Sequence, residues 1–183
     1  MTEYVALLRA VNVGGHAPLA MPALREAVAR WGARNIRTVL QSGNMVFESK
    51  RRPERELEGE LARSCETALH QRIEFFVRDS AAWRQLVSEN PFPDEAATDP
   101  AHLHVLFLKE DPVPDAWKRL REAIRGPERF AERPRLAYIL YPDGMGRSTL
   151  TPAVIERSLG SRGTDRNWNT VLRLHGLLAP DRA

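Results

Sequence analysis

The order of its predicted strands and helices is the feature of this sequence that most constrains its fold. Runs rich in apolar and β-branched residues predict strands, and runs with apolar residues spaced by three and four predict helices. In the first half these predicted elements are Tyr4–Val11, Met21–Trp31, Ile36–Leu40, Met45–Phe47, Pro53–Gln71 and Ile73–Val77. Their order is strand, helix, strand, strand, helix, strand, which is that of a ferredoxin-like domain.

The second half begins with the same order of elements. The predicted elements are a strand at His102–Lys109, a helix at Asp115–Ile124, a hairpin of Phe130–Arg133 and Leu136–Tyr141, and a helix from Thr151 to Gly160. Thr164 or Asn167 then caps a last helix, and no clear final strand is predicted. We therefore expect an α+β protein made of two ferredoxin-like halves of the βαββα type, packed together with added helices.

The predicted domain boundary lies in a segment rich in proline and turn-forming residues. It separates a first half at residues 1–90 from a second half at residues 101–183, with a linker at 91–100. The first strand of each half is apolar on both sides, so we expect both faces of each sheet to be covered.

Composition and the chain's N-terminal sequence favour a cytoplasmic protein. The only cysteine, Cys65, falls on the apolar stripe of a predicted helix, so intramolecular disulfides are impossible and a small buried thiol is expected. No apolar run approaches the roughly 20 residues that span a bilayer, and no basic start followed by an apolar stretch marks a signal peptide.

Four segments carry glycine, amide and arginine side chains that could bind a ligand. The first contains Arg9, Asn12, Gly14 and Gly15, where successive backbone N–H groups could form an anion-binding nest. A loop that simply needs positive φ is the alternative. Walker and dinucleotide-binding loops are excluded, because neither Gly-Lys-Ser/Thr nor a third glycine at the required spacing follows.

The second segment is Gln41-Ser42-Gly43-Asn44, which predicts a tight hairpin turn. Contact with a polar ligand is an alternative, and a nucleophilic role for Ser42 a more distant one. The third contains Gly146, Arg147 and Ser148 before a helix, where anion binding and helix capping are equally consistent. The fourth contains Arg166 and Asn167, which either cap the last helix or contact a ligand.

His102 and His104 point the same way on a predicted strand, as a metal-chelating pair would. No third ligand follows at a recognisable spacing, so we expect an ordinary strand end, no metal site and no cofactor.

The four segments together resemble a known bacterial family. The motifs are Leu7–Gly15, Gln41–Asn44, Tyr141–Ser148 and Arg166–Thr170, in that order. They are similar to those of the uncharacterised family catalogued as domain of unknown function 1697. The resemblance implies an α+β protein with two ferredoxin-like halves and no established activity. Two departures are Ala10, where the family often has glycine, and His16, where it often has lysine.

The leading functional hypothesis is a module that binds an anionic small molecule, such as a nucleotide or a phosphorylated metabolite, in a groove between the halves. The predicted lining residues share glycine, amide, hydroxyl or guanidinium chemistry: Arg9, Asn12, Gly14, Gly15, Gln41, Ser42, Gly43, Asn44, Gly146, Arg147, Ser148, Arg166 and Asn167. Residues 1–50 and 147–176 each carry a net charge of +3, whereas residues 51–146 carry −3.

Two other functions stay open at this point. One is an enzyme acting on phosphoryl or acyl substrates, with His16 as general base. The other is nucleic-acid binding by arginine-rich loops. A platform on the sheet face is disfavoured, because the first strand lacks the aromatic residues on which bases stack.

Overall fold

The computed structural model describes residues 1–10, 19–39 and 43–180. The chain divides into two compact units. The first comprises Met1–Ser88 together with the C-terminal residues from Arg173 onward, and the second comprises Glu89–Leu172. The chain therefore leaves the first unit after its third helix and returns to it within its last helix.

The first unit has the predicted βαββαβ order. Its elements are β1 (Thr2–Ala10), α1 (Met21–Trp31), β2 (Arg34–Val39), β3 (Asn44–Ser49), α2 (Glu54–Leu69), β4 (Ile73–Asp79) and α3 (Ser80–Ser88). The strands form an antiparallel sheet in the order β2-β3-β1-β4. Ala6 at the centre of β1 lies opposite Met45 of β3 and Val77 of β4.

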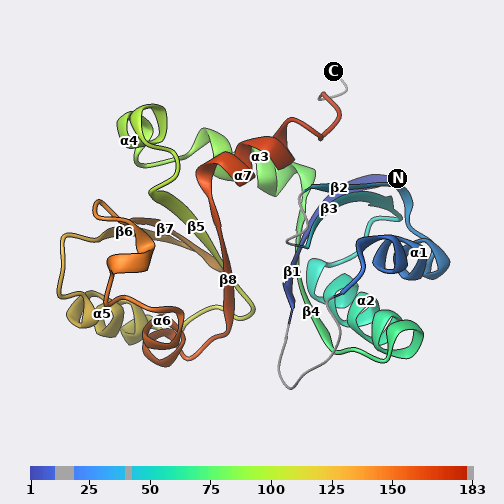
Figure 1. Ribbon diagram of the computed structural model, residues 1–183, viewed down its shortest axis with the longest axis horizontal. Helices are drawn as coiled ribbons and strands as arrows, with labels where there is room; N and C mark the ends of the chain where they lie inside the picture. The colour runs from blue at the N-terminus through green and yellow to red at the C-terminus, as the bar shows by residue number, and fades with distance from the viewer. Residues whose placement is uncertain (11–18, 40–42, 181–183) are drawn as a thin grey trace. The chain divides into compact units, whose positions relative to one another are not determined.

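Both faces of the first sheet are covered, as the apolar character of β1 predicts. Tyr4, Ala6 and Leu8 belong to a buried core with Leu24 of α1 and Leu57 of α2, and these two helices lie together on one side of the sheet (Figure 1). The alternate residues Val5 and Leu7 are also buried. Helix α3 contacts β1 and β4.

The second unit repeats this topology in full. Its elements are α4 (Pro93–Thr98), β5 (Leu103–Leu108), α5 (Pro114–Ala123), β6 (Arg129–Arg133), β7 (Leu136–Leu140), the 3₁₀ turn η1 (Met145–Arg147), α6 (Pro152–Leu159), β8 (Gly163–Asn167) and α7 (Trp168–His175). The antiparallel sheet has the order β6-β7-β5-β8. Helices α5 and α6 lie side by side on one face (Figure 1).

The final strand β8 corrects the prediction that the second half lacks one. Thr164 lies within β8 opposite Phe107, so it does not cap the last helix. The alternative cap is confirmed, because the Asn167 side chain accepts hydrogen bonds from the Thr170 N–H at 3.0 Å and the Thr170 hydroxyl at 2.9 Å. Helix α4 lies within the segment expected to be a linker.

Each unit protects its last strand with a glutamate from the preceding helix. Strands β4 and β8 are at sheet edges, where unpaired N–H groups invite pairing with other chains. Glu58 of α2 accepts a hydrogen bond from Val77 N–H at 2.9 Å, and Glu156 of α6 accepts one from Gly163 N–H at 3.2 Å. The two halves thus share this helix-to-strand hydrogen bond as well as their topology.

The C-terminal segment is held to the first unit through its backbone. Arg37 donates to the Leu177 carbonyl oxygen at 2.5 Å, and Arg84 donates to the Ala179 carbonyl oxygen at 2.5 Å. Glu3 accepts a hydrogen bond from Ala179 N–H at 2.8 Å.

Among the residues described, no helix combines the length and the apolar character needed to cross a membrane.

Candidate functional site

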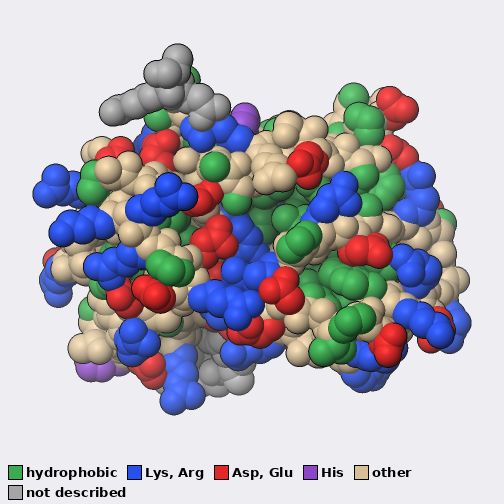
Figure 2. Space-filling view, turned by 180° about the vertical axis from the view of Figure 1, so that it is seen from behind, with side chains coloured by type: hydrophobic (Ala, Val, Ile, Leu, Met, Phe, Trp, Pro, Cys, Tyr) green, Lys and Arg blue, Asp and Glu red, His purple; other side chains and the backbone are tan. Residues whose placement is uncertain are grey.

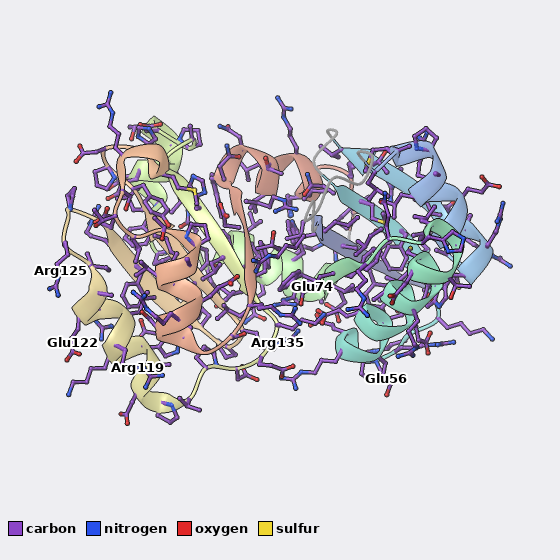
Figure 3. The ribbon with its side chains drawn as sticks, turned by 60° about the horizontal axis from the view of Figure 1, so that its bottom comes forward. Glu56, Glu74, Arg119, Glu122, Arg125 and Arg135 are labelled. Atoms are coloured by element: carbon purple, nitrogen blue, oxygen red, sulfur yellow. The ribbon has the colours of Figure 1, made fainter. Side chains whose placement is uncertain are left out.

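A pocket of about 370 Å³ lies in the second unit between segments 125–128 and 141–149. The first segment follows α5, and the second connects β7 to α6. Arg125 of the first segment and Arg147 at the end of η1 both line the pocket. Figure 3 labels Arg125 in the loop beyond α5, past Arg119 and Glu122 on the helix itself. Two guanidinium groups from different loops therefore line one pocket.

The two loops are joined by a hydrogen bond from the Ser148 hydroxyl to the Glu128 carboxylate. The same hydroxyl oxygen accepts a hydrogen bond from Leu150 N–H at 2.9 Å. The Glu128 carboxylate lies over Gly126, where a Cβ would come within 2.6 Å of Oε2. Ser148 thus fixes the loops as a turn residue, and it is Thr151 that caps α6.

The charged side chains that line the pocket do not form ion pairs with one another. Arg125, Asp143 and Arg147 are exposed, and within the described parts of the chain none of the three forms an ion pair. Glu128 also lines the pocket. Two guanidinium groups and two carboxylates therefore share a small open space without being paired across it.

Tyr141 is a buried wall of this pocket. It is 2% exposed, and its hydroxyl makes no hydrogen bond with any residue that the structure describes. Burial, together with the nearby Asp165 and Glu128 carboxylates, raises the pKa of the Tyr141 phenol well above its usual range. The phenol therefore stays protonated and is available as a hydrogen-bond donor.

An imidazole–carboxylate pair that the sequence analysis missed lies next to Tyr141. The His104 ring nitrogen Nδ1 is 2.7 Å from Asp165 Oδ2, and the His104 ring meets Tyr141 edge to face with 5.3 Å between ring centroids. Burial opposes ionisation of Asp165, but the hydrogen bond and charge of His104 outweigh it and lower the pKa of this carboxyl.

This pair could be found from sequence only by knowing the strand pairing. The sequence suggests for His104 only a metal-ligand role beside His102 or a place at an ordinary strand end, and it predicts no strand at Asp165. In the structure His102 pairs separately with Asp99, with 2.7 Å between Nδ1 and Oδ2. Among the described residues, no group of three or more His, Cys, Asp or Glu side chains is arranged to hold a metal ion.

Arg166 is not brought to the 141–149 loop. Successive side chains of a strand point to opposite faces, and Asp165 faces the side of Tyr141 and α6. Arg166 and Thr164 therefore lie on the other face, where the Arg166 guanidinium donates to the Thr164 hydroxyl at 2.8 Å. Burial lowers the pKa of Arg166. Asn167 is engaged as the cap of α7.

Two predicted residues of the first unit that the structure describes, Gly43 and Asn44, have structural roles. Gly43 has a φ of +73°, and its carbonyl oxygen accepts a hydrogen bond from Leu8 N–H at 2.7 Å. Asn44 is fully buried and its amide donates to the Val39 carbonyl oxygen at 3.3 Å. Arg9 lies opposite Glu74 of β4.

The remaining predicted site residues, Asn12, Gly14, Gly15, Gln41 and Ser42, lie outside the described residues, as does His16. The predicted groove between the halves stays a prediction.

A second pocket, of about 520 Å³, lies in the first unit beside the C-terminal segment. Its lining includes Glu3 and Arg84, which bind the backbone of that segment, and Glu48, which accepts a hydrogen bond from the Asn35 amide at 2.9 Å. These charged groups already have partners in the protein. The pocket of the second unit is therefore the better candidate for binding a charged ligand.

The family model described as "Protein of unknown function (DUF1697)" matches residues 1–138. The chain belongs to this family. The match confirms the family resemblance of the sequence motifs, and the family carries no established activity. No match to the chain was found among curated proteins.

A solved structure confirms the fold of this DUF1697-family chain. The chain is similar to the conserved bacterial protein SP0830 from Streptococcus pneumoniae, with a TM-score of 0.71, 18% sequence identity, and coverage of 97% of this chain and 98% of that one. A second structure is that of TA0507, provisionally assigned as a chlorite dismutase, with a TM-score of 0.30, 13% identity, and coverage of 98% and 100%. The first similarity shows a shared α+β fold, and the second is too weak to indicate anything.

Proposed function

We propose that this DUF1697-family protein binds an anionic small molecule, with the pocket of the second unit as its site. The observation that carries the proposal is that Arg125 and Arg147, neither of them in an ion pair with a described residue, line one pocket. A guanidinium group presents parallel N–H donors that match the oxygens of a phosphate or carboxylate. Thr149 adds a hydroxyl, and Tyr141 adds a protonated phenol.

This proposal narrows the site expected from the sequence. Arg147 and Ser148 are retained as lining residues, and Gly146 precedes them in η1. Arg125 is added. The proposal does not require the residues of the first unit, nor Arg166 and Asn167 on β8.

The test is a comparison of arginine variants by isothermal titration calorimetry. Wild type, Arg147→Ala and Arg125→Ala are titrated with inorganic phosphate and with ribose 5-phosphate. Each charge-assisted hydrogen bond is worth about 1.5–3 kcal/mol, so each variant should lose about 10- to 100-fold in affinity. Arg157→Ala is the matched control, because Arg157 is an exposed arginine of α6 away from the pocket. It should bind as wild type does.

Two results would reject the proposal. One is that wild type binds neither inorganic phosphate nor ribose 5-phosphate. The other is binding that Arg147→Ala and Arg125→Ala weaken no more than Arg157→Ala does. A thermal-shift measurement on the same variants supports the titration, because a ligand that binds only the native state raises the apparent melting temperature.

Proton-transfer catalysis on a phosphoryl or acyl substrate is a second candidate, favoured by the His104–Asp165 pair. A carboxylate that holds one imidazole nitrogen leaves the other to act as a base. Hydrolysis of p-nitrophenyl phosphate and p-nitrophenyl acetate by wild type and His104→Gln tests it. A rate above the buffer background that His104→Gln abolishes supports the enzyme, and equal rates for the two proteins reject it.

Nucleic-acid binding by loops finds less support. Basic side chains lie next to acidic ones across the face drawn in Figure 2. Binding through the phosphate backbone would weaken steeply as salt rises. A gel shift between 50 and 200 mM salt tests it, and affinity that is absent or insensitive to salt rejects it.

A further inference from the structure

The carboxylates of the pocket point to the chemical class of its ligand. A site for an isolated anion would be expected to exclude carboxylates, because like charges repel. Asp143 and Glu128 nevertheless line the same pocket as Arg125 and Arg147. Carboxylate oxygens accept hydrogen bonds, so they suit a ligand that offers donors as well as a negative charge.

The pocket also lacks a surface on which a nucleotide base could stack. Among the described residues that line it, Tyr141 is the only aromatic one, and at 2% exposed its ring presents no open face. Base recognition without hydrogen-bond specificity depends on stacking against exposed aromatic rings. The lining instead offers hydroxyl and carboxylate groups, which pair with the hydroxyl groups of a polyol.

We infer that the ligand of this pocket is the phosphate ester of a polyhydroxy compound, a sugar phosphate, and that Asp143 accepts hydrogen bonds from its hydroxyl groups. The inference rests on the proposed function. Arg125 and Arg147 bind the phosphate, and Asp143, which has no ion-pair partner among the described residues, binds the sugar. A nucleotide binds through its sugar phosphate alone, without a contribution from the base.

The experiment separates the phosphate from the sugar with one substitution. Wild type and Asp143→Asn are titrated calorimetrically with inorganic phosphate, ribose 5-phosphate and AMP. Asp115→Asn is the control, because Asp115 is an exposed aspartate in the first turn of α5 and does not line the pocket. Thermal unfolding of each variant without ligand shows whether its fold is intact.

Wild type should bind ribose 5-phosphate at least 10-fold more tightly than inorganic phosphate, and AMP no more tightly than ribose 5-phosphate. Asp143→Asn should weaken ribose 5-phosphate about 3- to 10-fold. It should leave inorganic phosphate unchanged or bound more tightly, because a nearby negative charge is removed. Asp115→Asn should change neither affinity.

Opposite outcomes distinguish this inference from the proposed function. If Asp143→Asn alters both probes equally, or if AMP binds more tightly than ribose 5-phosphate, the sugar-phosphate inference is wrong while anion binding stands. If wild type binds neither phosphate nor ribose 5-phosphate, the proposed function fails and the inference fails with it.

Discussion

Substituting Gly43 by alanine would test whether the Gln41–Asn44 motif is there for structure. Gly43 adopts a φ of +73°, a conformation that residues with a Cβ rarely take. A Cβ at this position would also lie 2.8 Å from Leu8 Cβ. Because Leu8 is 3% exposed and belongs to the core of the first unit, it cannot move aside freely. The close approach of these two backbones therefore requires glycine.

The magnitude follows from two separate costs. Placing an L-residue in the left-handed region costs about 1–2 kcal/mol. Forcing an extra methyl group against a packed core costs typically about 1–3 kcal/mol. Gly43→Ala should therefore lower the free energy of unfolding by about 2–5 kcal/mol, a large share of the total stability of a typical domain.

Gly160→Ala is the matched control for backbone strain alone. Gly160 has a similar φ of +66° at the end of α6, and no atom of the described residues lies within 4 Å of a Cβ built on it. Urea unfolding followed by circular dichroism gives the free energy of unfolding for both variants. Gly43→Ala should be less stable than Gly160→Ala by about 1–3 kcal/mol, which is the cost of the contact with Leu8.

Equal destabilisation by the two variants would refute this reasoning, since it would mean that Leu8 yields without cost. A Gly43→Ala variant as stable as wild type would refute the argument from φ as well. Only in the second case would a non-structural reason for the glycine return to consideration.

Three further predictions concern ionisable groups. Glu58→Ala should lower the free energy of unfolding by about 3 kcal/mol, because the Val77 N–H loses its acceptor and the buried Arg78 loses a nearby carboxylate. Glu58→Gln keeps an acceptor, so urea unfolding should show a smaller loss of stability. Equal losses for the two variants would contradict the hydrogen-bond argument. The Cys65 thiol, fully buried and with its pKa raised to about 11 by burial, should react with Ellman's reagent only on unfolding; native protein reacting as fast as protein in urea would contradict this. Because the pKa of Asp165 is lowered in the folded protein, its ionisation stabilises the protein above the unfolded pKa of about 3.9, and this stabilisation is lost as the pH falls through the folded pKa. The difference in free energy of unfolding between wild type and Asp165→Asn, measured in urea from pH 7 to 3, should therefore shrink below about pH 4. A constant difference would show that the charge is not involved.

Most secondary-structure elements could be predicted from the sequence, because they depend on local patterns. The helix Met21–Trp31 has the predicted bounds and ends at Gly32 in the left-handed region. The helix from Pro152 begins after the predicted cap, with Val154 N–H donating to the Thr151 hydroxyl at 3.4 Å. Periodicity and capping act over a few residues, so they can be recognised without knowledge of the fold.

Strand β8 and the site could not be predicted in this way. The segment Gly163–Asn167 has no alternation of apolar residues, and it becomes a strand because it pairs with β5. That pairing places Asp165 beside His104, which is 61 residues away in the chain. The pocket likewise depends on two loops that the Glu128–Ser148 hydrogen bond joins.

The sequence by itself determined the order of most strands and helices, the ends of several helices and the membership of the family, because these follow from short-range patterns and recognisable motifs. Only the tertiary structure decided which polar side chains share a site. Successive side chains of a strand point to opposite faces of the sheet, so Asp165 lies on the side of Tyr141 and the adjacent Arg166 lies on the other side. Adjacency along the chain therefore did not indicate a shared site.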